Sequence, residues 1–446
     1  MTRFVATLAR GLTRGLFLGL ILALPVRAEV AIQEVTTPGG ITAWLVEEHS
    51  IPFTALELRF RGGTSLDQPG KRGATNLMTG LLEEGAGDLG ARDFTRAVEN
   101  LAASFHYDVY DDTLAVSAKF LSENRDAAIE LLRQSLVAPR FDPEAIERVR
   151  AQVVSGIKSD LTDPDEIASS AFAARIYQDH PYATPGQGDL DSVAGLTRDD
   201  LVTAWKNALV RDRLFVGVVG DITAEELSTL LDSLLADLPQ SGPALPGEAA
   251  LHFDGGTHVV EFDTPQSVVR FGQPGMSQDD PDFFAAYLLN TIIGGGGFES
   301  VLMQEVREKR GLTYGVYAYL LDKDEAKVWV GSVSSANDRV AETIAVIRAE
   351  WARIAANGVS AERLEAAKKY MTGAYPLRFD GNGPIANIIA SMQLSGMPID
   401  YAATRNDRVN AVTLEQVNRV AASLMDPEAL TFVVTGKPEG LPATAD

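Results

Sequence analysis

The chain has 446 residues, of which 46% are hydrophobic and 22% charged, and it contains no cysteine. This composition is typical of a globular protein of two or more domains, and it excludes disulfide bonds, thiol catalysis and cysteine-based metal sites. The formal net charge of −22 at pH 7 argues against nucleic acid as a partner, because phosphate binding needs clustered Lys and Arg.

The first 28 residues have the pattern of a secretory signal peptide. The apolar run LFLGLILALP is preceded by Arg3, Arg10 and Arg14, and VRA supplies small residues at the cleavage positions before Glu29. An uncleaved membrane anchor is the less favoured interpretation, because a spanning helix needs roughly 20 apolar residues. Without the four arginines of this leader the chain holds 35 basic and 61 acidic residues, a net charge of −26. We expect a periplasmic protein with no stable membrane association once the leader is removed.

Beyond the leader, strand-like runs precede helix-like runs in each half of the chain. The strand-like runs are residues 41–48 and 55–63 in the first half and residues 258–262 and 267–275 in the second. Long helical stretches follow, for example residues 281–293 and 338–358. Strands grouped before helices, rather than alternating with them, predict the α+β class, with helices packed on mainly antiparallel sheets.

Two segments repeat at an offset of 216 residues. Leu196–Asp221 aligns without a gap with Val412–Lys437, so that Thr197 matches Thr413 and Gly220 matches Gly436. Each copy reads as a capped amphipathic helix, a short turn and a β-rich run that ends in glycine. The repeat predicts two homologous halves.

A proline- and glycine-rich stretch separates these halves. Residues 238–256, LPQSGPALPGEAALHFDGG, keep neither helix nor strand periodicity and predict a linker. We therefore divide the chain into a signal peptide at 1–28, a first domain at 29–237, the linker at 238–256 and a second domain at 257–446. His252 and His258, on either side of Asp254, have the spacing of no standard metal motif, so we expect solvated loop histidines there.

Several segments resemble, in order and spacing, the pitrilysin and insulinase family of zinc peptidases. The segments are RGGTSLDQPGKRGATNLMTGLL, HPYATPGQGDLDSVAGLTRDDLVTAW, VGVVGDI and GGGGFESVLMQEVREKRGLTYGVYAYL, and the similarity runs over nearly the whole mature chain. The sequence is most similar to the two-subunit bacterial branch related to mitochondrial processing peptidase and the respiratory-complex core proteins. The resemblance implies that the two α+β halves form half of a clamshell.

Active members of that family carry His-x-x-Glu-His on the helix that follows Arg72. Two histidines one helical turn apart bind Zn²⁺, and the glutamate between them activates the bound water. At these three positions this chain has Asn76, Thr79 and Gly80, and the third zinc ligand of the family falls near Gly156. The resemblance therefore implies a degenerate site that holds no metal.

The second half keeps two residues that match the family pattern. Arg307 and Tyr314 correspond to an arginine and a tyrosine that family members place across the cavity, on the peptide near the zinc. A guanidinium offers forked donors to a carbonyl or carboxylate, and a phenol can hydrogen-bond the oxyanion of peptide hydrolysis. The alternative is that Arg307 lies on a solvated helix face and that Tyr314 packs at the start of a strand.

A run of four glycines, Gly294, Gly295, Gly296 and Gly297, follows an apolar helix. It does not fit a phosphate-binding loop, which needs G-x-x-x-x-G-K-[ST]. Two readings stay open. The run is either a helix C-cap with a flexible connector, or a flexible loop that lets a substrate backbone or a facing subunit approach closely.

Together these observations predict the non-catalytic subunit of a heterodimeric, periplasmic zinc peptidase. A homologous partner subunit with His-x-x-Glu-His would hold the zinc, and Arg307 and Tyr314 would act in trans on its peptide substrate. The acidic charge of the mature chain would favour basic or neutral peptides. Two alternatives remain: a non-enzymatic scaffold or peptide-binding protein of the same fold, and a self-sufficient peptidase with an unrecognised site.

Overall fold

The computed structural model describes residues 31–441, and residues from Ile32 onward belong to one compact unit. The predicted signal peptide lies outside the described residues. Between residues 31 and 441, no helix combines the length and the hydropathy that a bilayer crossing requires.

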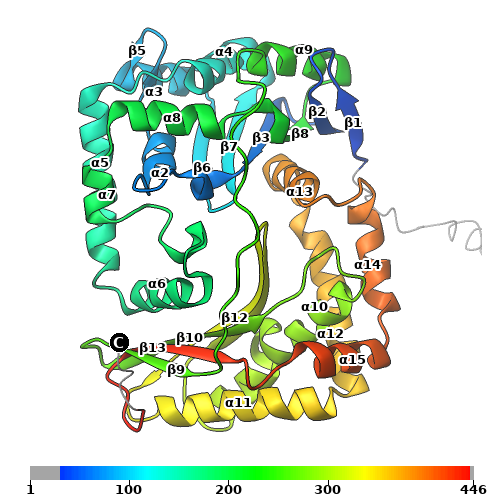
Figure 1. Ribbon diagram of the computed structural model, residues 1–446. Helices are drawn as coiled ribbons and strands as arrows, with labels where there is room; N and C mark the ends of the chain where they lie inside the picture. The colour runs from blue at the N-terminus through cyan, green and yellow to red at the C-terminus, as the bar shows by residue number, and fades with distance from the viewer. Residues whose placement is uncertain (1–30, 442–446) are drawn as a thin grey trace, which may run out of the picture. The chain divides into compact units, whose positions relative to one another are not determined.

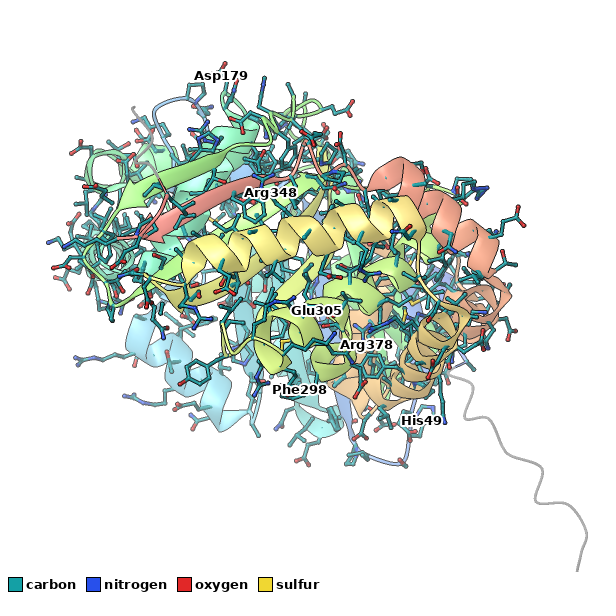
Figure 2. All side chains as sticks on the ribbon, turned by 90° about the horizontal axis from the view of Figure 1, so that it is seen from below. His49, Asp179, Phe298, Glu305, Arg348 and Arg378 are labelled. Carbon is teal, nitrogen blue, oxygen red and sulfur yellow. The ribbon has the colours of Figure 1, made fainter. Side chains whose placement is uncertain are left out.

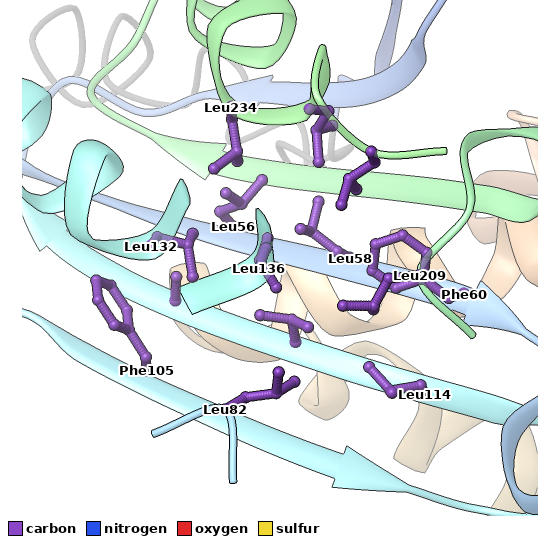
Figure 3. Close-up of a cluster of buried hydrophobic side chains, with 14 of the residues drawn as sticks. Leu56, Leu58, Phe60, Leu82, Phe105, Leu114, Leu132, Leu136, Leu209 and Leu234 are labelled. Atoms are coloured by element: carbon purple, nitrogen blue, oxygen red, sulfur yellow. The ribbon is translucent and has the colours of Figure 1, made fainter. Parts of the chain in front are cut away.

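The first sheet is built from the first half of the chain. Its strands lie in the order β1 (Gln33–Thr36), β2 (Thr42–Glu47), β8 (Leu214–Gly220), β3 (Phe53–Arg61), β7 (Thr113–Leu121) and β6 (Ser104–Val109). All neighbours are antiparallel except β2 and β8. One face is buried against helices of the same half, where Leu56, Leu58 and Phe60 of β3 meet side chains of α4 (Arg125–Val137), as Figure 3 shows.

Other helices of this half are α2 (Ala74–Thr79), α3 (Ala91–Asn100), α5 (Pro143–Asp160), α6 (Pro164–Tyr177), α7 (Leu190–Ala194), α8 (Arg198–Ala208) and α9 (Ala224–Leu235). Residues 238–256 form neither helix nor strand. They lead into the second sheet, whose strands lie in the order β11 (Val316–Lys323), β12 (Ala326–Ala336), β10 (Gln266–Pro274), β13 (Thr431–Gly436) and β9 (Thr257–Glu261).

The second half repeats the topology of the first. Its helices are α10 (Phe283–Asn290), α11 (Val340–Asn357), α12 (Ala361–Ala374), α13 (Asn382–Leu394), α14 (Tyr401–Ala411) and α15 (Leu414–Leu424). The order β9-β13-β10-β12-β11 corresponds to β2-β8-β3-β7-β6, and in each sheet the first of these pairs is parallel. The predicted α+β fold with two homologous, mainly antiparallel halves is confirmed (Figure 1).

The residues that revealed the repeat have matching structural roles. Thr197 and Thr413 are N-caps with complete capping boxes, at the starts of α8 and α15. Gly220 and Gly436 end β8 and β13 with φ of 147° and 154°. A Cβ atom at Gly220 would lie 2.3 Å from the carbonyl oxygen of Phe53, so glycine is required there by backbone conformation and by space.

The two halves exchange one helix each. Helix α6 of the first half packs on β10 and β13 of the second sheet, and α13 of the second half packs on β2, β3 and β8 of the first (Figure 1). Gly217 of β8 lets α13 approach, because a Cβ atom there would lie 2.5 Å from the carbonyl oxygen of Ala386. Each sheet therefore has one face covered by its own half and part of its other face covered by a helix of the other half.

Candidate functional site

Helix α2 carries the three positions at which zinc peptidases of the resembled family have His-x-x-Glu-His. Asn76 lines a cavity, Thr79 is buried and donates its hydroxyl to the carbonyl of Thr75 at 2.8 Å, and Gly80 ends the helix. A Cβ atom at Gly80 would lie only 3.1 Å from a methyl group of Val149, so α5 occupies the space that a larger residue needs.

These positions do not fit a zinc ion. They supply one amide, one hydroxyl that is already bonded and one glycine, whereas zinc takes imidazole, thiolate or carboxylate ligands. Within residues 31–441, no group of three or more His, Asp or Glu side chains is placed to hold a metal ion. The neighbouring Ile157 on α5, close to the position of the third family ligand, is buried and apolar.

We expect chelation to leave the stability of this chain unchanged. Because the α2 positions offer no zinc ligands, prolonged dialysis against EDTA should not alter the midpoint of thermal unfolding measured by calorimetry. A fall of several degrees that Zn²⁺ restores would contradict this reading of α2.

A buried carboxylate anchors the start of α2. Asp67 accepts hydrogen bonds from the backbone N–H groups of Gly73 and Thr75, both at 2.8 Å, and from the Thr75 hydroxyl at 2.7 Å. Its side chain is 2% exposed and lies 3.7 Å from a guanidinium nitrogen of Arg72. Burial raises the pKa of Asp67, and the donors from Thr75 and Gly73 oppose that effect. Asp67 thus satisfies N–H groups at the helix start that otherwise lack partners.

Replacing Asp67 with alanine should lower the free energy of unfolding by about 2 kcal/mol, because buried donors would lose their acceptor. Urea unfolding of Asp67→Ala against the wild type measures this loss. Asp93→Ala is the matched control, since Asp93 lies in the first turn of α3 with a side chain 65% exposed. A similar loss in both variants would refute the role of Asp67 as an anchor.

A cavity of about 1070 Å³ lies beside α2 and is lined by both halves of the chain. This volume is at the upper end of the range of ligand-binding cavities. The first half contributes Asn76, Asp111, Asp112, Asp160, Glu166, Tyr177, Tyr182 and Gln187, and the second half contributes Arg270, Asp279, Tyr319, Leu321, Lys323 and Lys327, among others.

The turn between β11 and β12 closes one wall of this cavity. The Lys323 ammonium pairs with Asp111 and lies 4.2 Å from the ring centroid of Tyr182. The Tyr182 hydroxyl donates to Asp112 and accepts the backbone N–H of Glu325 at 3.2 Å. Burial and the nearby Asp112 carboxylate raise the pKa of Tyr182, so its hydroxyl keeps its proton at neutral pH. These contacts bind the second half firmly to the first.

Arg307 and Tyr314 do not line this cavity. Arg307 lies in η7 (Met303–Glu308), a π-helical segment, with its guanidinium carbon 4.5 Å from the ring centroid of Phe298 and its Nε 3.5 Å from Glu308. Figure 2 shows this segment, with Phe298 and Glu305 labelled. Tyr314 precedes β11 and is 86% exposed. The structure therefore does not bring Arg307 and Tyr314 to the degenerate positions of their own chain.

The glycine run is partly helical. Gly294 and Gly295 end η5 (Thr291–Gly295), a π-helical turn that continues α10. A Cβ atom at Gly294 would lie 2.7 Å from the backbone nitrogen of Ala318, so this residue packs against β11. Gly297 has a φ of 63° and open space around its Cα. Another chain can therefore approach the backbone closely at Gly297, whereas the absence of a side chain at Gly294 allows close packing against β11.

His258 differs from the expected solvated loop residue. It lies in β9 with its side chain 15% exposed, and its Nε2 is 2.9 Å from a carboxylate oxygen of Asp254. The expectation of a solvated loop was wrong for this residue because β9 begins at Thr257, directly after the predicted linker, so that His258 belongs to a strand. His180, by contrast, caps a short 3₁₀ turn by accepting the N–H of Tyr182.

The residues that the second half contributes to the cavity wall could not be identified from the sequence. Asp111 and Lys323 are 212 residues apart, and nothing in their local sequence predicts that they pair. One signal was present, because VYAYLLDK alternates tyrosines with small or apolar residues and predicts a strand with one aromatic face.

Comparisons with known proteins show the family of this chain. Residues 43–188 match the model of Insulinase (Peptidase family M16), and residues 195–371 match that of the Peptidase M16 inactive domain. The chain is 27% identical to a protein named non-peptidase homolog YmxG from Helicobacter pylori, over 87% of this chain and 90% of the relative. It is 24% identical to an uncharacterized zinc protease from Streptomyces coelicolor, over 88% of this chain and 87% of the relative.

Among solved structures, a peptidase M16 inactive domain from Pseudomonas fluorescens superposes with a TM-score of 0.86 at 26% identity, covering 93% of this chain and 99% of that one. A protease from Helicobacter pylori has a TM-score of 0.82 at 17% identity, covering 91% and 99%, which shows the shared fold. The two family models together cover most of the chain, and the chain belongs to the M16 peptidase family as a homologue whose His-x-x-Glu-His positions are degenerate.

Proposed function

We propose that this protein is the non-catalytic subunit of a heterodimeric, periplasmic zinc peptidase of the M16 family. The observation that carries the proposal is a contrast between two sites. The zinc positions on α2 have lost their ligands, whereas Tyr314 is 86% exposed and has no hydrogen bond within the described chain. An exposed phenol without a hydrogen-bond partner in its own chain is available to a second chain or to the substrate of that chain.

In this arrangement the zinc and the acid–base glutamate belong to a homologous partner that carries His-x-x-Glu-His. This chain would supply Arg307, whose forked donors suit a carbonyl or carboxylate of the bound peptide. Tyr314 would donate a hydrogen bond from its hydroxyl to the oxyanion that develops on the scissile carbonyl. Phe298 stacks on the Arg307 guanidinium and limits its conformations, which favours a fixed direction for its donors.

Reconstitution tests the proposal. Cleavage of a quenched fluorescent peptide should be measured with this chain alone, with a candidate His-x-x-Glu-His subunit alone, and with both mixed. Only the mixture should cleave at full rate. Full activity of the partner by itself would contradict an accessory role in catalysis.

The second candidate is a non-enzymatic scaffold or peptide-binding protein of the same fold. It is favoured by the name of the Helicobacter pylori relative, which describes a non-peptidase homologue. Under this alternative the chain would associate with a partner or a peptide, and substitution of Arg307 or Tyr314 would change no rate.

Peptide charge should affect cleavage by the complex. The 61 acidic residues outnumber the 35 basic residues that remain without the leader, so basic peptides should be attracted and acidic peptides repelled. At low salt, kcat/KM for a basic peptide should exceed that for its acidic counterpart, and added salt should reduce the difference. Equal kcat/KM values at low salt would argue against this preference.

A further inference from the structure

The two faces of the second sheet are covered unequally. One face is fully buried, with Val316 and Ala318 of β11 in the main core of the second half. On the opposite face α6 packs on β10 and β13, and the alternate residues Tyr317 and Tyr319 of β11 stay 51% and 48% exposed. Tyr314 lies just before them. We call Tyr317 and Tyr319 the tyrosine face.

Exposed aromatic side chains in such a group are unusual on a soluble surface and are typical of binding surfaces. Tyr317 lies opposite Ser332 and Tyr319 opposite Val330 on β12, so small side chains leave both rings accessible. Each ring offers a flat apolar surface together with one hydroxyl, a combination that suits contact with both side chains and backbone of a partner.

The tyrosine face continues into the cavity beside α2. Tyr319 belongs to both, and Leu321 and Lys323, further along β11, also line the cavity. A chain that lies extended along β11 from Tyr314 would therefore reach the cavity at Tyr319. Side chains on one side of an extended chain recur every second residue, about 7 Å apart, which is the spacing at which Tyr317 and Tyr319 follow each other on β11.

The charges that line the cavity indicate what it would bind. Its cations are paired: Arg61 with Asp324, Arg270 with Asp165, Lys323 with Asp111 and Lys327 with Asp322. The carboxylates of Glu166 and Asp279 also line the cavity, and their side chains have no hydrogen bond or ion pair in the part of the chain that the structure describes. The cavity thus has unpaired negative charge and complements a positively charged group.

We propose that the tyrosine face and the cavity together form a track for an extended peptide. Apolar or aromatic side chains at positions i and i+2 of the peptide stack on Tyr317 and Tyr319, and a lysine or arginine beyond them enters the cavity near Glu166 and Asp279. The inference rests on the proposed function in taking a peptide as the ligand, but it needs neither the partner subunit nor zinc.

Fluorescence anisotropy with the purified chain alone tests this track. The parent probe is a labelled peptide in a Gly/Ser background with two phenylalanines two residues apart and a lysine beyond them. One comparison peptide has the phenylalanines three residues apart, one has alanines in their place, and one has glutamate in place of lysine. The parent should bind about tenfold more tightly than each of the first two, as expected for two stacked ring pairs.

Substitutions in this chain test whether the tyrosine face and the cavity cause these differences in peptide affinity. The double variant Tyr317→Ser/Tyr319→Ser should lose about tenfold in affinity for the parent, whereas Tyr317→Phe/Tyr319→Phe should keep it. Tyr370→Ser is the matched control, because Tyr370 is 57% exposed on α12 and does not line the cavity. Glu166→Gln/Asp279→Asn should remove the preference for lysine over glutamate and keep the dependence on phenylalanine spacing. Calorimetry of each variant verifies folding.

The proposal is overturned if no peptide of the series binds, if spacing has no effect, or if the serine double variant binds as the wild type does. It is also overturned if that variant loses association with a His-x-x-Glu-His subunit but still binds the parent peptide, because the face would then be a subunit interface. Cleavage by the reconstituted pair without peptide binding to this chain alone would refute only the track. Binding without cleavage would refute only the proposed function.

Discussion

Substitution of Tyr314 by phenylalanine should lower kcat of the reconstituted two-subunit peptidase by about 10²-fold, with little change in KM. The ring would stay in place, and only the hydroxyl that we assign to the oxyanion would be lost. An interaction made only in the transition state affects kcat rather than ground-state binding, and loss of one such donor typically has this magnitude. Because Tyr314 is 86% exposed, the change should not disturb the fold.

The measurement is steady-state kinetics of the mixture, with subunit association followed in parallel by analytical ultracentrifugation. Tyr370→Phe is the control, since Tyr370 is an exposed tyrosine on α12 and belongs to neither η7 nor the segment of Tyr314. Arg307→Ala should also lower kcat/KM, with a larger share of the effect in KM, because a guanidinium that positions the peptide already acts in the ground state. Unchanged rates in both variants, with association intact, would favour the scaffold.

Replacing Gly217 with alanine should lower the free energy of unfolding by about 3 kcal/mol, the upper part of the range for overpacked cores. The added Cβ atom would lie 2.5 Å from the carbonyl oxygen of Ala386 and 2.9 Å from the backbone nitrogen of Ala390. Both atoms are helix backbone, so α13 as a whole would have to move away from β8. Urea unfolding measures the loss.

Gly247→Ala is the matched control, because no atom lies within 4 Å of the Cβ position there. It should leave the free energy of unfolding within about 0.5 kcal/mol of the wild type. Gly272→Ala, where α6 approaches β10 of the second sheet, should also destabilise, since its Cβ atom would lie 2.8 Å from the carbonyl oxygen of Trp329 and 2.9 Å from the ring of Phe172. A loss below 1 kcal/mol at Gly217 would show that α13 adjusts easily.

The fold could be read from the sequence to the extent that it depends on local signals. The caps at Thr197 and Thr413 and the terminal glycines Gly220 and Gly436 predicted the repeat, and each has the structural role that its local sequence indicates. The exchange of α6 and α13 could not be predicted, because an apolar helix face does not specify which sheet it will cover. The choice depends on close contacts such as that between Gly217 and Ala386, which are 169 residues apart in the sequence.

In the candidate site, too, local features could be predicted from the sequence and features that depend on tertiary packing could not. The loss of zinc ligands at Asn76, Thr79 and Gly80 is visible in the sequence, since the motif is local. The cavity wall is not, because Asp111 and Lys323 meet only when the two halves pack together. The π-helical turn that holds Arg307 was also missed, since a single wider turn has no periodic signature in the sequence.

The exchange of α6 and α13 also bears on how such a protein can change during evolution. A chain that no longer needs zinc chemistry could in principle shed the half that carried it. Here that deletion would strip a covering helix from the surviving sheet and expose its apolar surface, including Val328 and Val433, to water and to aggregation. Single substitutions can therefore remove the motif on α2 without loss of the fold, whereas deletion of either half would destabilise the half that remains.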